Sequence, residues 1–241
     1  MRLIDVETRA LRTFYGENTP DYAILSHKWG KEHEEVTFAQ FQTPDNCLNI
    51  PGFKKIDFLC QEAAKNGIGW AWMDTCAIDK SSSSEVGEAI NSMFTWYKNS
   101  KICYAHLSDV DIKAGDNFLD SQWWTRSWTL QELMAPRTLQ FFDTNWTLIG
   151  DKASLAKEIS EKTGIHEVCL RDSKEMFFKS VAQRMSWASL REATRVEDLA
   201  YSLLGIFHVN IPLQYGEGKG AFIRLQQEIM RTTNDQSLFA W

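Results

Sequence analysis

Cysteine is sparse in this sequence, and its spacing excludes two common kinds of small, cross-linked fold. Five cysteines occur among 241 residues, an odd number, and no two stand in a CxxC pair. The sequence therefore indicates neither a disulfide framework nor a zinc ribbon, and its five histidines show no metal-ligand spacing. We expect no metal site and a reducing, cytoplasmic environment.

Long apolar runs and massed positive charge are also missing. No apolar run approaches the ~18 residues that span a bilayer, and the N-terminus lacks the basic-then-apolar pattern of a secretory signal. The net charge is −6, with Lys and Arg scattered along the chain, so nothing attracts a polyanion such as nucleic acid. We expect a soluble protein with no membrane span and no nucleic-acid partner.

The composition is that of an ordinary globular protein, apart from its tryptophans. Hydrophobic residues make up 44% and charged residues 24%, which suits a folded core and argues against disorder. The chain has 10 Trp, whose large rings carry an N–H that needs a partner. Such residues favour half-wet clefts as well as cores.

The first half alternates short apolar runs with amphipathic helical patterns, which is typical of βα units and a parallel sheet. Three runs are too short for helices and predict buried strands over residues 22–26, 70–74 and 102–107. Helices are predicted between them, over residues 53–64 and 86–97. Ser82 and Glu85 stand at capping-box spacing before the second helix.

The rest of the chain is predicted to be mostly helical. A third helix covers residues 125–134 and stops at Pro136, which cannot continue it. Residues 139–142 and 146–149 predict a hairpin, and helical spacing follows from about residue 150. We divide the chain into an α/β core, residues 1–150, and a helical part packed on it, residues 151–241.

Polar residues follow the predicted strands at the edge where open parallel sheets bind ligands. We expect substrate binding by the residues that end the first strand and the second, namely Ser26, His27, Lys28, Trp29, Asp74 and Thr75. Two of them have an equally good structural interpretation. His27 could be satisfied by backbone groups, and Asp74 could cap the turn that follows it.

Glu132 is the candidate for catalysis. On the third helix it lies opposite the apolar stripe, so we expect it to face away from the core, on the same side as Trp128. The carboxylate could hold a ribose and stabilise the positive charge of a breaking glycosidic bond, while the indole stacks on a flat ring. The alternative is a solvated carboxylate without a role. Arg126 could bind phosphates or pair with a carboxylate.

Two further features have a structural interpretation that we favour. Residues 216–220 (GEGKG) are rich in glycine but lack the Walker spacing and a preceding buried strand, so a turn leading into a helix is favoured over a phosphate loop. Cys76 follows a strand without an obvious His/Asp arrangement, which favours a small buried side chain over a nucleophile.

Six segments resemble the successive blocks of fungal heterokaryon-incompatibility (HET) domains and together span nearly the whole chain. They are YAILSHKWG, WAWMDTCAIDKSSSSEVGEAINSMFTWY, RSWTLQELMAP, VAQRMSWAS, TRVEDLAYSLLGIF and YGEGKGAFIRLQQEI. HET domains are in turn similar to Toll/interleukin-receptor (TIR) domains. Three segments of this chain, ILSHKWG, EAINSM and SWTLQEL, resemble successive blocks of TIR domains in the same order, with Thr129 in place of the usual Cys. The resemblance implies a TIR-like (flavodoxin-like) parallel sheet flanked by helices, with a mainly helical C-terminal extension. It also places Glu132 on the glutamate that cleaves NAD in enzymatic TIR domains.

The function that this resemblance implies is that of a cell-death effector in heterokaryon incompatibility or innate immunity. It would be an NADase that hydrolyses NAD, its substrate, to nicotinamide and ADP-ribose or a cyclic form when assembled, with no tightly bound cofactor. The implied partners are further copies of the chain and an upstream receptor or amyloid-signalling protein. The alternatives are a non-enzymatic interaction module that recruits partners and a nucleotide-binding regulator without turnover. The native chain could continue beyond Trp241.

Overall fold

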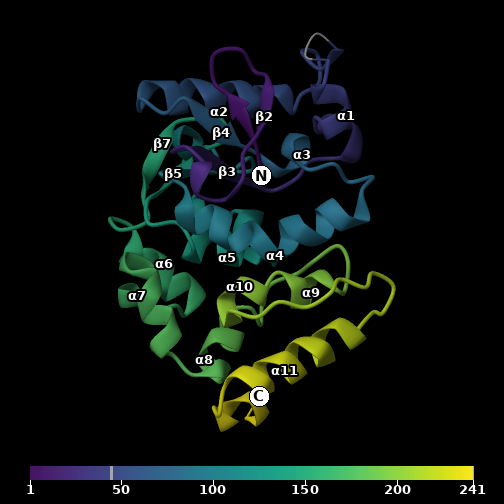
Figure 1. Cartoon of the computed structure of the whole chain (residues 1–241). Helices are drawn as coiled ribbons and strands as arrows, with labels where there is room; N and C mark the ends of the chain where they lie inside the picture. Colours follow the sequence, from purple (N-terminus) through teal and green to yellow (C-terminus); the bar gives the residue numbers. More distant parts are fainter. Residues whose placement is uncertain (44–45, 241) are drawn as a thin grey trace.

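A seven-stranded mixed sheet forms the centre of the computed structural model, which describes residues 1–43 and 46–240 (Figure 1). Its strands lie in the order β2-β1-β4-β3-β5-β6-β7. Their bounds are β1 (Arg2–Asp5), β2 (Leu11–Thr13), β3 (Ala23–His27), β4 (Trp70–Trp72), β5 (Ile102–His106), β6 (Leu139–Phe142) and β7 (Leu148–Asp151).

The four central strands are parallel. β3 pairs with both β4 and β5, and β5 pairs with β6. Counted from β3 in chain order, they lie in the order 2-1-3-4, which is the flavodoxin-like arrangement. The predicted α/β class is therefore confirmed, with antiparallel strands added at both edges of the sheet.

The three predicted buried strands are confirmed with small shifts of their ends. β3 extends one residue further than expected, to His27, and all five of its residues are buried. β4 ends at Trp72 because the chain turns into a short helix, α3 (Asp74–Ala77). Asp74 therefore begins a helix instead of ending a strand.

The two edges of the sheet differ in how well the sequence predicts them. The N-terminal hairpin of β1 and β2 is not predicted, because only Leu3 and Ile4 are buried in these short strands. The hairpin of β6 and β7 is predicted, but β7 begins at Leu148 instead of residue 146. The Asp143 carboxylate accepts hydrogen bonds from the backbone of Asn145 and Thr147 and so prolongs the turn.

Helices cover both faces of the sheet. α2 packs on one face, whereas α4 and α5 lie on the other, between the sheet and the C-terminal helices (Figure 1). The helix bounds are α1 (Phe38–Phe41), α2 (Phe53–Lys65), α4 (Ser83–Asn99), α5 (Thr129–Met134), α6 (Ala156–Thr163), α7 (Glu167–Arg171), α8 (Val181–Ser186), α9 (Asp198–Tyr201), α10 (Leu204–Phe207) and α11 (Gly220–Thr232).

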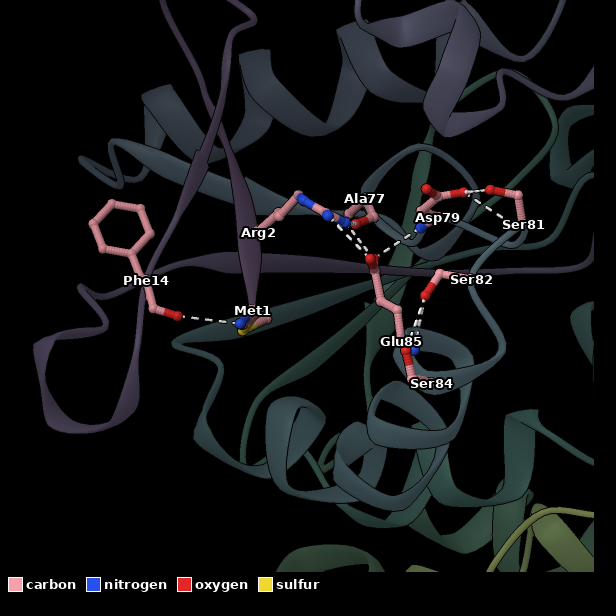
Figure 2. Close-up of polar contacts among 9 residues, drawn as sticks. All are labelled: Met1, Arg2, Phe14, Ala77, Asp79, Ser81, Ser82, Ser84 and Glu85. Carbon is pink, nitrogen blue, oxygen red and sulfur yellow. Dashed lines mark hydrogen bonds and ion pairs between the residues drawn. The ribbon is translucent and has the colours of Figure 1, made fainter.

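The start of α4 has half of the predicted capping box. The Ser82 hydroxyl accepts a hydrogen bond from the Glu85 backbone N–H at 3.3 Å, as expected. The Glu85 carboxylate does not return to Ser82. It pairs with the Arg2 guanidinium of β1 and accepts the Asp79 N–H at 2.8 Å (Figure 2). This contact ties the N-terminal strand to α4.

The third predicted helix is shorter than expected and begins at Thr129, not at residue 125. Residues 122–125 form a separate 3-10 turn, and Arg126 is extended. The reason is a backbone bridge to the C-terminal half, in which Ser127 donates to the carbonyl of Glu192 and the Glu192 N–H donates to that of Thr125. The helix ends at Met134, two residues before Pro136, as predicted.

The C-terminal part is mainly helical, as predicted, and shares its apolar core with the sheet. One cluster of buried side chains runs from β3 and α4 to α10 and α11 and includes Ile24, Phe94, Leu204 and Leu225. The predicted division at residue 150 stays a prediction. Among the described residues, no helix is both long and apolar enough to cross a membrane.

Candidate functional site

A cavity of 680 Å³ opens where β3 and β4 end, within the range of ~300–1,000 Å³ typical of small-molecule sites. The α/β core and the C-terminal half both contribute to its wall. Polar and aromatic lining residues are His27, Lys28, Trp29, Asp74, Lys80, Ser81, Ser83, Arg126, Trp128, Thr129, Glu132, Thr194, Arg195, Asp198 and Tyr215, and apolar ones include Ile78, Ile90, Met93 and Leu213.

The structure brings most of the predicted site residues together at this cavity. Of the nine, seven line it. Ser26 lies just behind the wall, where its hydroxyl is bonded to Glu132. Thr75 does not line the cavity and is almost fully buried in α3.

Glu132 is buried, with 7% of its surface exposed, so the expectation that it faces away from the core is wrong. All six residues of α5 are buried, because the helix is enclosed by the sheet, α4 and the C-terminal half. The Ser26 hydroxyl donates to the Glu132 Oε2 and itself accepts the Trp123 indole N–H at 2.8 Å. This chain fixes the carboxyl group at the cavity wall.

Burial raises the pKa of Glu132 to about 8, against the lowering effect of the Ser26 hydrogen bond. Asp74 raises this pKa further, whereas the Arg191 guanidinium lowers it. A pKa of about 8 leaves this carboxyl group largely protonated at neutral pH. A cation entering the cavity would favour its ionised form.

This raised pKa makes the stability of the fold depend on pH. Because the pKa is 4.5 in an ordinary peptide and about 8 here, the contribution of Glu132 is fully present below pH 4.5 and is lost as the pH rises through 8. We expect Glu132→Gln to have nearly the stability of the wild type at pH 5. At pH 9 its free energy of unfolding should exceed that of the wild type by about a few kcal/mol, and its melting temperature should be higher. Melting curves at both pH values check this, and a pH-independent difference would contradict it.

Asp74 and Trp29 form a second polar group at the cavity. The Trp29 indole N–H donates to Asp74 Oδ2 at 2.8 Å, and the Lys80 ammonium lies 3.5 Å from the centre of the indole ring. Asp74 Oδ1 is buried and has no hydrogen-bond partner in the described part of the chain. Burial raises the pKa of Asp74, although Lys80 opposes the shift. This oxygen can accept a hydrogen bond from a ligand.

The remaining predicted residues supply hydrogen-bond donors. Burial lowers the pKa of His27 well below 6.5, with Lys55 adding to the effect, so His27 is a neutral imidazole at neutral pH. It can donate one N–H to a ligand. Lys28 bonds the Gln122 side chain, and Arg126 bonds the Thr194 hydroxyl at 3.3 Å. No carboxylate of residues 1–43 or 46–240 forms an ion pair with Arg126.

Several site residues were missed because they come from the C-terminal half. Arg195, Asp198 and Tyr215 close one side of the cavity, where the Tyr215 hydroxyl donates to Asp198 Oδ1 at 2.9 Å. These residues belong to the segments TRVEDLAYSLLGIF and YGEGKG. The polar residues clustered in those segments could have marked them as candidates for the site. No sequence pattern, however, places these segments at the cavity beside β3.

The structure agrees with the structural interpretation favoured above for the glycine-rich loop and for Cys76. The Glu197 carboxylate accepts the N–H groups of Gly216 and Gly218 at 2.8 and 3.0 Å, so a side chain of the protein already occupies these donors. The loop leads into α11 at Gly220. Cys76 is fully buried, and burial raises the pKa of its thiol well above 9.

Comparison with known proteins gives two matches to family models and one to a curated relative. Residues 22–119 match the family described as Heterokaryon incompatibility protein (HET), and residues 220–241 match a domain of unknown function (DUF8212). The chain is 43% identical over 233 residues to the Vegetative incompatibility protein HET-E-1 of Podospora anserina. The alignment covers 92% of this chain but 17% of that protein, so the chain spans about a sixth of its length. No solved structure is significantly similar.

Proposed function

Through residues 22–119 this chain belongs to the heterokaryon-incompatibility (HET) family, and we propose that its cavity binds NAD and cleaves the nicotinamide–ribose bond. The observation that carries the proposal is Glu132, a buried carboxyl group on the wall of a 680 Å³ cavity. NAD carries a positive charge on its nicotinamide ring. A buried carboxylate is the group that recognises such a charge most strongly, because water does not screen it.

The reaction proposed for Glu132 is the stabilisation of a ribosyl cation. The bond between C1′ of the ribose and the nicotinamide nitrogen breaks, its electron pair stays on that nitrogen, and neutral nicotinamide leaves. The positive charge that develops on the ribose is stabilised by the Glu132 carboxylate. Water then adds to C1′ and loses a proton, which gives ADP-ribose; attack by an adenine nitrogen instead would give a cyclic product.

The other groups of the cavity suit the rest of a dinucleotide. Asp74 Oδ1 is an acceptor for a ribose hydroxyl, since it is buried without a partner among the described residues. Lys28, Arg126 and the neutral His27 are donors for the pyrophosphate. Trp29 and Trp128 offer flat apolar walls for the two bases.

The biological role proposed for this activity is cell death in vegetative incompatibility. The fungal relative is named for vegetative incompatibility, and loss of NAD would be a direct route to death. The proposal includes a distant similarity to TIR enzymes, self-assembly, and activation by an upstream receptor or amyloid-signalling partner. No upstream partner is needed to test the chemistry itself.

Incubation of the purified chain with NAD tests the proposed activity. Nicotinamide and ADP-ribose, or its cyclic form, should appear in equal amounts, and concentrated or artificially clustered protein should be tried because the family is expected to act when assembled. If NAD binds without cleavage under all of these conditions, the chain is a nucleotide-binding regulator. If NAD does not bind, the non-enzymatic interaction module is favoured.

Ligand binding gives a further prediction for Trp29. The side chain is 47% exposed, so Trp29→Ala should leave the melting temperature nearly unchanged. It removes a wall of the cavity and the N–H that holds Asp74, so we expect ADP-ribose binding, measured by calorimetry, to weaken about tenfold or more. Phe178→Ala is the matched control, since Phe178 is 80% exposed and lies outside the cavity. Equal affinities of the two variants would contradict the site.

A further inference from the structure

A buried arginine of the C-terminal half reaches the helix that carries Glu132. Arg191 follows α8 and is only 7% exposed. Its Nη1 donates to the carbonyl of Arg126 at 2.9 Å and to the Thr129 hydroxyl at 2.8 Å, and its Nε donates to the carbonyl of Trp187. One guanidinium group therefore joins the C-terminal half to the first residue of α5 and to the turn before it.

The position of α5 depends on such contacts. The helix has six residues, and isolated helices of fewer than ~12–15 residues are not stable in water. Its approach is held by the backbone bridge between Thr125, Ser127 and Glu192, the residue next to Arg191. Residues 191–192 thus fix where the first turn of α5 begins, and Glu132 is the carboxylate of that turn.

Arg191 also differs in charge from the other groups around Glu132. These are Ser26 and Cys103 of the sheet, Asp74 of α3, Tyr97 of α4 and Arg191 itself. Among these described groups, Arg191 alone is a cation. Burial lowers the pKa of Arg191 to about 10, and Glu132 opposes this shift, so the guanidinium stays charged at neutral pH.

We propose that Arg191 is a positioning residue for Glu132, which holds the first turn of α5 and supplies the positive charge behind its carboxylate. The C-terminal half would then both hold the helix that carries Glu132 and form one side of the cavity. The catalytic meaning of this inference rests on the proposed function, but the placement and charge of Glu132 can be measured without any turnover.

Lys152 provides a matched control at the other end of the same helix. Lys152 is 3% exposed, and its ammonium group donates to the carbonyls of Leu133 and Pro136 at 3.0 and 2.6 Å. It is thus a second buried cation that holds α5. It is not among the groups that shift the pKa of Glu132.

The test is a titration of Glu132 by NMR in protein labelled with carbon-13 at the glutamate carboxyl groups, the signal being assigned by its loss in Glu132→Gln. We expect Arg191→Met to raise the titration midpoint by ~1 pH unit or more, as the loss of a nearby opposite charge does. Lys152→Met should move it by much less. Equal shifts in the two variants, or none in Arg191→Met, would overturn the proposal.

Arg191→Lys keeps the test decisive if Arg191→Met does not fold. It retains the charge but loses the paired contact to Arg126 and Thr129, so the midpoint should stay within about half a pH unit of the wild type. A shift as large as that expected for Arg191→Met would overturn the assignment of the charge. If the wild type cleaves NAD, the pH profile of cleavage by Arg191→Met should move to higher pH. If it does not, the NMR result still decides whether Arg191 supplies the positive charge that acts on Glu132.

Discussion

Glu132→Gln is expected to lower the rate of NAD cleavage by ~10²–10³, because it removes the negative charge that we propose stabilises the ribosyl cation and keeps the size of the side chain. The effect should depend on pH in the wild type. Since burial raises the pKa of Glu132 to about 8, cleavage at low NAD concentration should rise with pH and level off above pH 8. Nicotinamide release, followed between pH 6 and pH 9, measures both effects.

The matched control for this variant is Glu158→Gln. Glu158 lies on the exposed side of α6, away from the cavity, so the same chemical change there should leave the rate unchanged. Cleavage at the wild-type rate by Glu132→Gln would show that another group does the chemistry. If Glu132→Gln abolished cleavage but remained toxic in cells, death would come from recruitment of partners instead.

Gly205→Ala is expected to have the largest effect on stability. Gly205 lies in α10 where this helix crosses α4, and a Cβ atom added there would lie 2.1 Å from the Cβ of Phe94 and 2.2 Å from its Cγ. Because the clash involves atoms close to both backbones, a rotamer change cannot relieve it, and the helices must separate. We expect a loss of ~3 kcal/mol or more and a fall in melting temperature of about 10 °C.

Two further variants separate this close approach from the general effect of a glycine. Gly87→Ala adds the same methyl group to α4, where no atom lies within 4 Å, and it should be neutral or stabilising by up to ~1 kcal/mol. Phe94→Ala removes the ring but keeps its Cβ, so it should not rescue Gly205→Ala. Full rescue by Phe94→Ala would show that the helices do not approach as closely as described.

The sequence predicts the centre of the fold and the β6–β7 edge but not the β1–β2 edge, for a physical reason. β3 and β5 are buried on both faces, and such strands appear as continuous apolar runs. β2 has no buried residue, so no pattern marks it. The true start of α5 depends on a backbone bridge to Glu192, which is a tertiary contact that local spacing cannot indicate.

The same distinction applies to the candidate site. The rule that ligands bind at the carboxyl ends of parallel strands selects Ser26, His27 and Asp74 from the sequence, and the structure places them at or beside one cavity. The burial of Glu132 could not be predicted, because helix spacing defines its face but not what covers that face. Arg191 and Tyr215 come from distant segments, and only the folded chain brings them to α5 and the cavity.

A crystal structure of Glu132→Gln with NAD bound would test directly whether Glu132 faces the bond that breaks, since slow turnover in this variant should preserve the intact dinucleotide. We expect NAD to fill the cavity with C1′ of the nicotinamide ribose facing position 132, a ribose hydroxyl on Asp74, and the pyrophosphate near Lys28 or Arg126. NAD bound elsewhere, for example beside Gly216 and Gly218, or in the cavity with its adenine end at position 132, would contradict it.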